Sequence, residues 1–242
     1  MTLDFRSPNN NMKEFEKLQG TIKYSFKNIE LLRQALTHRS YLNEHPDFKL
    51  GHNERLEFLG DAVLEIIVTE HLFNSFPQTP EGDLTDWRAS LVNAKMLASI
   101  AKDLMIEENL YLSRGEEKDD NSKARQYILA NAMEALIGAI YLDGGLEGAK
   151  TFIHNFVISH LEHILANHLY LDPKSRFQEK AQELTGITPH YKVISENGPD
   201  HEKIFEVGLY LNEDLIAIGR GSSKQEAQVA AAAQGLINKE WK

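Results

Sequence analysis

Apolar residues recur at the spacing of an amphipathic helix through the first two thirds of the chain. This pattern predicts helices over residues 28–36, 54–76, 84–104, 128–142 and 146–166. Pro77 and Gly145 supply two stop signals, because proline cannot continue a helix and glycine tolerates a left-handed cap. No strand-like alternation appears before residue 187. We therefore predict an all-α domain over residues 12–168.

The pattern changes at Asp172 and Pro173, which suit the N-cap and the first position of a helix. Three strand-like runs follow this helix, over residues 190–195, 204–211 and 215–219. Ser223 and Glu226 then form a capping box that opens an alanine-rich helix. The prediction is a small α+β domain of order α-β-β-β-α over residues 173–242.

The helix predicted over 54–76 begins with Asn53-Glu54-Arg55-Leu56-Glu57-Phe58-Leu59-Gly60-Asp61. Asn53 is a candidate N-cap, because its side-chain oxygen can accept a free first-turn amide. At about 100° per residue, Glu54, Glu57 and Asp61 share one stripe of roughly 60°. The opposite side, which includes Ile66, is apolar. The stripe is either a solvated acidic face or a site for a hard cation such as Mg²⁺, which takes oxygen ligands.

The fourth predicted helix is apolar on all sides apart from Asn131 and Glu134, so we expect it to be buried. An ionised Glu in such a helix is costly unless it is paired or bound to metal. Gly60 and Gly138 have no side chains and would let the two helices approach closely. The favoured arrangement gathers four side chains around one cation: Glu57, Asp61, Asn131 and Glu134. The alternative is that Glu134 is a buried acid hydrogen-bonded to Arg55 or to a backbone amide.

Composition narrows the class of protein. The chain has no cysteine, which excludes disulfides, thiolate zinc sites and cysteine nucleophiles. No stretch approaches the roughly 18 uninterrupted apolar residues of a membrane span. Residues 1–11 are polar, lack the apolar segment of a signal peptide, and are expected to form a flexible tail. These features predict a soluble, cytoplasmic protein without a membrane partner.

The net charge of −10 argues against a surface that coats nucleic acid generally. Residues 1–172 carry 17 Lys and Arg against 26 Asp and Glu, whereas residues 173–242 carry 9 against 10. The strongly charged stretch 115–123 is expected to be a loop. Any binding of RNA or DNA must therefore depend on local patches or on bridging metal ions.

Several motifs in this chain occur together, and in the same order, in one known family. They are Leu36-Thr37-His38-Arg39-Ser40, the run from Asn53 to Asp61, Glu81-Gly82-Asp83 and Glu134-Ala135-Leu136-Ile137-Gly138. On these motifs the chain resembles bacterial ribonuclease III over nearly its whole length after the first dozen residues. Its C-terminal domain looks like the double-stranded-RNA-binding domain that follows the nuclease domain in those enzymes.

The resemblance implies a homodimeric endoribonuclease that depends on Mg²⁺, with Mn²⁺ as a substitute, and cuts both strands of duplex RNA. The products would carry 5′-phosphates, 3′-hydroxyls and short 3′ overhangs, and the family's expected roles are rRNA precursor processing and mRNA turnover. By motif position the metal ligands are Glu57, Asp61, Asn131 and Glu134. Glu54 and Glu81 would be accessory catalytic acids, and Phe58 would contact the partner subunit.

In the C-terminal domain the resemblance implies contacts to the shape and 2′-hydroxyls of A-form RNA. Gln178, Glu179 and Gln182 would touch one minor groove, His201 the next, and Lys224 the phosphates. The domain departs from strongly basic relatives at Gln225, which follows Lys224 where many relatives carry more Lys or Arg.

Position 131 is a further departure, because the family carries Asp there and this chain has Asn. Asn offers an oxygen without a charge, so we expect weaker Mg²⁺ binding and impaired cleavage, at about tenfold in rate per 1.4 kcal/mol. Asn131 is a tolerated natural variant, a natural change toward binding without cutting, or a change introduced to inactivate the protein. Two alternatives to the nuclease stay open: a non-cleaving double-stranded-RNA-binding protein on the same scaffold, and an all-α structural protein with solvated acids.

Overall fold

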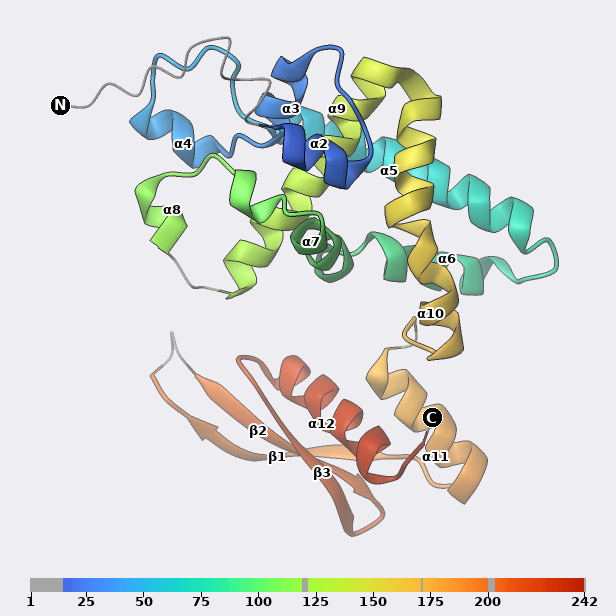
Figure 1. Cartoon of the computed structure of the whole chain (residues 1–242). Helices are drawn as coiled ribbons and strands as arrows, with labels where there is room; N and C mark the ends of the chain where they lie inside the picture. Colours follow the sequence, from blue (N-terminus) through green and yellow to red (C-terminus); the bar gives the residue numbers. More distant parts are fainter. Residues whose placement is uncertain (1–14, 119–121, 171, 200–202, 242) are drawn as a thin grey trace. The chain divides into compact units, whose positions relative to one another are not determined.

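The computed structural model describes residues 15–118, 122–170, 172–199 and 203–241. The chain divides into two compact units, with the boundary between Ile164 and Leu165. Figure 1 shows helices throughout the first unit and a three-stranded sheet with two helices in the second. The predicted fold class, an all-α part followed by a small α+β part, is confirmed. The tail expected over residues 1–11 lies outside the described residues.

The first unit is built from helices of very different length. They are α2 (Glu16–Ile22), α3 (Ile29–Ala35), α4 (Arg39–Glu44), α5 (Glu54–Ser75), α6 (Glu81–Val92), α7 (Ala94–Asp103), α8 (Arg114–Lys118), α9 (Ser122–Phe156) and α10 (Leu161–Ala166), with 3-10 turns η1 (Glu107–Asn109) and η2 (Ile158–His160). The predicted stop before Pro77 is confirmed, because α5 ends at Ser75. The stop at Gly145 is present as a kink inside α9, where Gly145 has φ 70°.

Four local predictions in this unit were wrong. Residues 146–166 do not form one helix, because α9 ends at Phe156 and the 3-10 turn η2 separates it from α10. Residues 84–104 do not form one helix, because the Asn93 side chain accepts a hydrogen bond from the Met96 amide at 2.9 Å and opens a new helix, α7. The stretch 115–123 is not simply a loop, because α8 extends to Lys118. Asn53 does not cap α5 with its side chain. It is buried, and its Nδ2 donates to the Ala35 carbonyl at 3.2 Å instead.

The long helices α5 and α9 form the most extensive helix pair of the first unit. Their backbones meet at Gly60 and Gly138, as the sequence predicted. A Cβ at position 60 would collide with the Glu134 carbonyl group and lie 2.8 Å from the Gly138 amide nitrogen, and a Cβ at position 138 would collide with the Leu56 carbonyl. Glycine is therefore required on both helices for this close approach.

A hydrogen-bond cluster fixes the point where α9 bends. The Asp143 carboxylate accepts from the Tyr24 hydroxyl at 2.8 Å and from the backbone amides of Lys27 and Asn28 at 3.0 and 2.8 Å. The loop between α2 and α3 is thereby tied to the end of the straight, apolar half of α9. This contact raises the pKa of Tyr24 to about 12, through burial first and then its bond to Asp143.

The second unit consists of α11 (Pro173–Thr185), β1 (His190–Asn197), β2 (Ile204–Leu211), β3 (Asp214–Gly221) and α12 (Lys224–Asn238). The strands form one antiparallel sheet in the order β1-β2-β3. Both helices pack on one face of the sheet around a core that includes Phe177, Leu209 and Leu236 (Figure 1). The predicted Asp172 cap is confirmed, because its carboxylate accepts from the Lys174 and Ser175 amides.

None of the helices in the described part of the chain combines the length and the apolar character needed to cross a membrane.

Replacing Gly60 with alanine is expected to lower the free energy of unfolding by about 1–3 kcal/mol or more, because the methyl group must displace backbone atoms of α9. Gly20→Ala is the matched control, since a Cβ there meets nothing within 4 Å inside helix α2. It should be neutral or stabilising by up to about 1 kcal/mol. Urea unfolding followed by far-UV circular dichroism compares the two, and equal effects would contradict the close approach.

Candidate functional site

The close approach of α5 and α9 sets acidic side chains of two helices beside one another. Glu57 and Asp61 flank Gly60 on α5, and Glu134, whose carbonyl faces Gly60, projects from α9. Burial, and then the charges of Asp61, Glu57 and Glu65, raise the pKa of Glu134 to about 7. Burial and the charges of Glu54 and Asp61 also raise the pKa of Glu57. Glu134 therefore interacts electrostatically with acids of α5 that precede it in the chain by 69 to 77 positions.

Glu134 is half-buried, and no hydrogen bond or ion pair joins it to another residue in the described ranges. The alternative in which Arg55 or a backbone amide satisfies this carboxyl is therefore not what the structure contains. Asn131 precedes Glu134 by three residues on α9 and is likewise half-buried. Its side chain also has no hydrogen bond among the described residues. Two polar side chains thus lie without hydrogen-bond partners in the stretch 128–140 of α9, whose other residues are buried.

The chemistry of these side chains fits a divalent cation. Three carboxylates and an amide oxygen form a hard, oxygen-only donor set. A cation would offset both the burial of charge and the repulsion that together raise the two pKa values. In the described ranges no three His, Cys, Asp or Glu side chains are already gathered at the spacing of a metal site. The residues that would hold the ion, Glu57, Asp61, Asn131 and Glu134, would therefore have to turn toward one another.

The remaining predicted acids differ in their surroundings. Glu54 is exposed at the start of α5, where its Oε1 lies 3.4 Å from Arg39 Nη1. Glu81 is exposed at the start of α6 and accepts a hydrogen bond from Thr85. No hydrogen bond or ion pair between described residues joins Glu81 to the other acids. Electrostatic interactions thus link Glu57, Asp61 and Glu134 to one another, and Glu54 to Glu57. The place of Glu81 in this site stays a prediction.

Sequence reasoning missed two charged partners of this acidic centre. Arg39 is part of the Leu36–Ser40 motif, which was assigned no role beyond the family resemblance. Its ion pair with Glu54 forms because α4 lies near the start of α5. Glu65 was expected to be solvated, but its Oε2 lies 3.0 Å from Arg88 Nε on α6. An arginine 23 positions away offers no periodic signal, so only the fold could reveal this pair.

An exposed apolar stripe runs along α5. Phe58 is 81% exposed, Ile66 59% and Phe73 70%, and the three fall within about 80° of one another around the helix. Ile66, which the sequence placed on the apolar side opposite the acidic stripe, is therefore apolar but not buried. Phe58 also does not belong to the core of this chain, so the stripe is available to another molecule.

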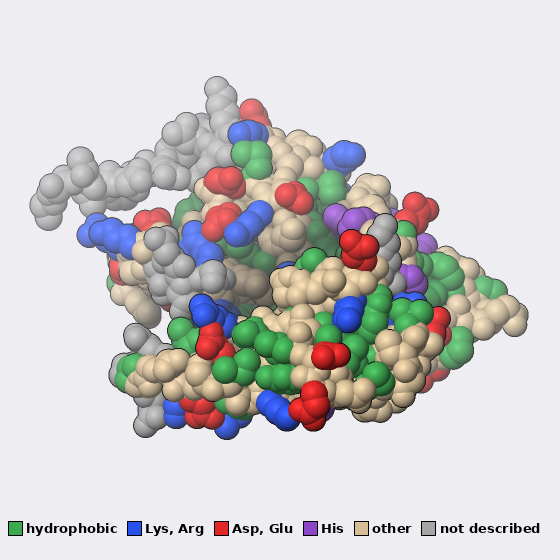
Figure 2. Space-filling view, turned by 90° about the horizontal axis from the view of Figure 1, so that it is seen from below, with side chains coloured by type: hydrophobic (Ala, Val, Ile, Leu, Met, Phe, Trp, Pro, Cys, Tyr) green, Lys and Arg blue, Asp and Glu red, His purple; other side chains and the backbone are tan. Residues whose placement is uncertain are grey.

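In the second unit the described candidate RNA contacts are on the surface. Gln178, Glu179 and Gln182 are exposed on α11, and Lys224 is exposed at the first position of α12. His201 lies outside the described residues. On the face seen in Figure 2, from below the view of Figure 1, acidic and basic side chains of the described residues are interspersed.

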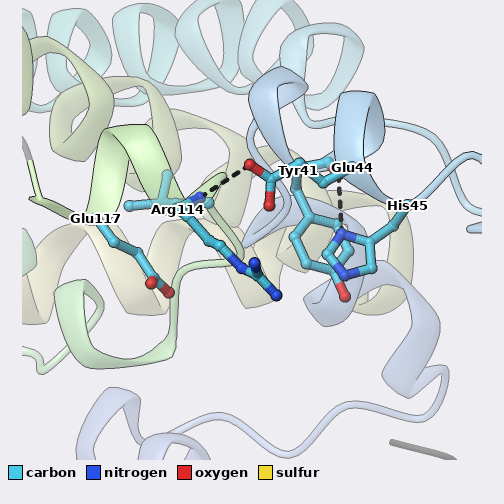
Figure 3. A pocket seen from close by; sticks show the side chains of 6 residues that line it. Tyr41, Glu44, His45, Arg114 and Glu117 are labelled. Carbon is cyan, nitrogen blue, oxygen red and sulfur yellow. Dashed lines mark hydrogen bonds between the residues drawn. The ribbon is translucent and has the colours of Figure 1, made fainter. Parts of the chain in front are cut away.

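A pocket of about 540 Å³ lies in the first unit between α4 and α8. Figure 3 shows the Arg114 side chain extending between Glu117 and the stacked rings of Tyr41 and His45. Leu112 and Glu44 complete the lining. None of these residues is among the predicted site residues, and we assign the pocket no part in the chemistry.

The fold and the acidic centre define a class of protein: a helical nuclease domain followed by a double-stranded-RNA-binding domain. A family model described as Ribonuclease-III-like matches residues 28–161, and one described as double-stranded RNA binding motif matches residues 173–239. The chain belongs to the ribonuclease III family. It is thus an endoribonuclease by family, with double-stranded RNA as the class of substrate.

Individual relatives agree with this assignment. Ribonuclease 3 of Carboxydothermus hydrogenoformans is 43% identical, over 93% of this chain and 94% of that protein. Ribonuclease 3 of Campylobacter fetus is 42% identical, over 91% of this chain and 96% of that protein. A solved nuclease domain of ribonuclease III from Campylobacter jejuni has a TM-score of 0.54 and 44% identity, covering 62% of this chain and 97% of that chain.

The raised pKa of Glu134 predicts a pH-dependent cost to stability when no divalent cation is present. The carboxyl ionises near 4.5 ordinarily and near 7 in the folded protein, so ionisation destabilises the fold increasingly as the pH rises from about 4.5 to 7. Glu134→Gln removes this cost. Its gain in melting temperature over the parent should therefore grow between pH 5 and 7 and level off above pH 7.

Thermal unfolding in EDTA at several pH values measures this gain. Glu147→Gln, an exposed acid on the same helix α9, is the control and should show no such trend. A gain from Glu134→Gln that is the same at pH 5 and pH 8 would contradict the burial of an ionisable carboxyl here.

Proposed function

We propose that this chain is a Mg²⁺-dependent endoribonuclease that cleaves double-stranded RNA, with Mn²⁺ as a substitute for Mg²⁺. Its products carry 5′-phosphates and 3′-hydroxyls with short 3′ overhangs. The observation that carries this proposal is the contact of α5 and α9 at Gly60 and Gly138, which places Glu134 beside the acids of α5. Cytoplasmic processing of rRNA precursors and turnover of mRNA are the roles we propose with it.

The roles of the side chains follow from their chemistry. Glu57, Asp61, Asn131 and Glu134 hold the ion. When bound, a divalent cation neutralises the charge that develops on the phosphoryl oxygens and promotes deprotonation of the attacking water. Glu54 and Glu81 are accessory acids, and Glu54 is oriented by its ion pair with Arg39. A bound cation would also cancel part of the negative charge of the carboxylates, which would lower the local repulsion between this acidic domain and a polyanion.

The active form that we propose is a homodimer in which two acidic centres face one duplex. The exposed stripe of Phe58, Ile66 and Phe73 supports this, because an apolar stripe of this kind is typical of a surface that another subunit covers. A second structure of the Campylobacter jejuni nuclease domain, described by structural flexibility in a region involved in dimer formation, has 44% identity and a TM-score of 0.53. It covers 60% of this chain and 96% of that chain.

The C-terminal domain would hold the duplex. Gln178, Glu179 and Gln182 on α11 contact one minor groove, His201 contacts the next, and Lys224 contacts phosphates at the N-terminus of α12. Such contacts recognise A-form shape and 2′-hydroxyls rather than sequence. The domain therefore adds affinity for duplex RNA, and the acidic centre supplies the cut.

Asn131 favours a second candidate function, a protein that binds duplex RNA without cutting it. The amide keeps an oxygen ligand but removes one of four charges from the donor set. The other acids of the centre are intact. We therefore propose the nuclease first, with cleavage impaired by this one missing charge.

Asn131→Asp is expected to raise the rate of duplex-RNA cleavage by at least about tenfold, the equivalent of about 1.4 kcal/mol in the barrier. The measurement is single-turnover cleavage of a radiolabelled duplex in Mg²⁺ and in Mn²⁺. Asn155→Asp, the same change at an exposed position of α9, is the matched control and should leave the rate unchanged. Cleavage by neither the parent nor Asn131→Asp would exclude the nuclease, and binding without cleavage would favour the second candidate.

Phe58→Ala should weaken dimerisation at least about tenfold, because a large exposed ring at a subunit contact is a typical energetic hot spot. Sedimentation velocity over a range of protein concentrations measures the monomer–dimer equilibrium. Leu184→Ala, which truncates an exposed apolar residue of the second unit, should leave that equilibrium unchanged. Equal dimerisation of the parent and Phe58→Ala would remove this residue from the interface.

A further inference from the structure

Lys224, the residue proposed to meet RNA phosphates, is already engaged with a carboxylate. Its Nζ lies 2.8 Å from Glu196 Oε1, and Lys203 Nζ lies 3.8 Å from the other oxygen of the same carboxylate. These lysines come from α12 and from the residue that precedes β2, whereas Glu196 is on β1. Two cations from separate segments therefore converge on one anion, an arrangement that would equally suit a phosphate.

The register of the sheet explains why the Glu196 carboxylate lies near Lys224. Glu196 pairs with Phe205 on β2, and Phe205 has the parity of Val207 and Leu209, which are buried on the helix-covered face. Glu196 therefore points toward the side of the sheet on which α12 begins. Lys224 Nζ also lies 5.5 Å from the centre of the Phe205 ring, so a cation–π contact holds the ammonium in the same place.

The ion pair is open to exchange. The side chain of Lys224 is 57% exposed and that of Glu196 is 36% exposed. Ion pairs exposed to this extent contribute little to stability, because water screens them and holding two long side chains costs entropy. A phosphate of an approaching duplex can therefore replace the carboxylate without disturbing the fold.

We propose that Glu196 is an intramolecular competitor of RNA: its carboxylate occupies Lys224 and Lys203 in the free protein and must be displaced when a phosphate binds. The carboxylate thereby lowers the affinity of the domain for double-stranded RNA and favours release of the RNA. This inference rests on the proposed contact of Lys224 with RNA. Glu196, an acid on β1, would then help to determine how tightly this chain binds RNA.

The test measures binding of the full chain to a blunt RNA duplex of about 16 base pairs, the length one such domain spans, in EDTA so that no strand is cut. Glu196→Gln keeps the size of the side chain and one acceptor oxygen but removes its charge. It should tighten binding about fivefold, the effect of one pair of unit charges at about 4 Å in water. The slope of log K against log salt should steepen by about 0.9 for each additional phosphate that the freed lysines neutralise.

Glu206→Gln is the matched control. Glu206 is an acid of the same sheet, but its partners are Arg220 and Ser195 on the face away from the helices. The Glu206→Gln substitution removes an equal charge from the same domain, so it measures the effect on RNA affinity of removing one negative charge in general. Tightening by Glu206→Gln equal to that by Glu196→Gln would overturn the inference, because the effect would then not depend on Lys224.

Lys224→Met separates this inference from the function on which it rests. We expect it to weaken binding and to abolish the gain from Glu196→Gln in the double variant. If Lys224→Met weakens binding but Glu196→Gln binds no more tightly than the parent, Glu196 is not a competitor and the proposed RNA contact stands. If Lys224→Met leaves binding unchanged, the proposed contact of Lys224 itself fails, and the inference fails with it.

Discussion

The contact between the backbones of α5 and α9 is the constraint on which the first unit depends. Gly60 and Gly138 let two long helices approach until main-chain atoms touch, which no residue with a Cβ permits here. The same contact brings Glu57 and Asp61 close enough to Glu134 for their charges to repel one another. Close packing and mutual repulsion of acids thus have one cause, and neither can be changed without the other.

The apolar packing of these helices must offset the repulsion within the acidic centre. Ala135 and Ala139 on α9 are buried against Leu56 and Ala35, and Phe26 and Leu31 pack on the same cluster. The Asp143 carboxylate ties the loop before α3 to the bend in α9, which holds the apolar half of that helix in register with α5. Packing on either side of the acids therefore keeps them together when no cation balances their charge, and a half-protonated Glu134 near neutral pH lowers the remaining cost.

Features that are encoded locally were predictable from the sequence, and those that depend on distant partners were not. The end of α5 before Pro77, the bend at Gly145 and the cap at Asp172 each follow from residues within one turn. The pairing of α5 with α9 was predicted because glycine at both positions is a signal in itself. Asn53 is a residue type that often caps helices, but its side-chain amide instead donates a hydrogen bond to the Ala35 carbonyl, 18 positions away. The partners of Glu54, Glu65 and Glu196 were missed for the same reason, since an ion pair between separate elements leaves no periodic trace.

These missed pairs share a physical logic that suits an acidic protein whose substrate is a polyanion. A chain with a net charge of −10 repels RNA at long range, and cations left free on its surface would partly reverse that. Instead Arg39 lies beside Glu54 at the acidic centre, and Lys224 lies beside Glu196 in the second unit. Each pair is partly exposed, so its energy in water is small, and phosphate can compete for the cation at contact distance. At these two places the cation is therefore available to RNA only when a phosphate comes close enough to replace the carboxylate.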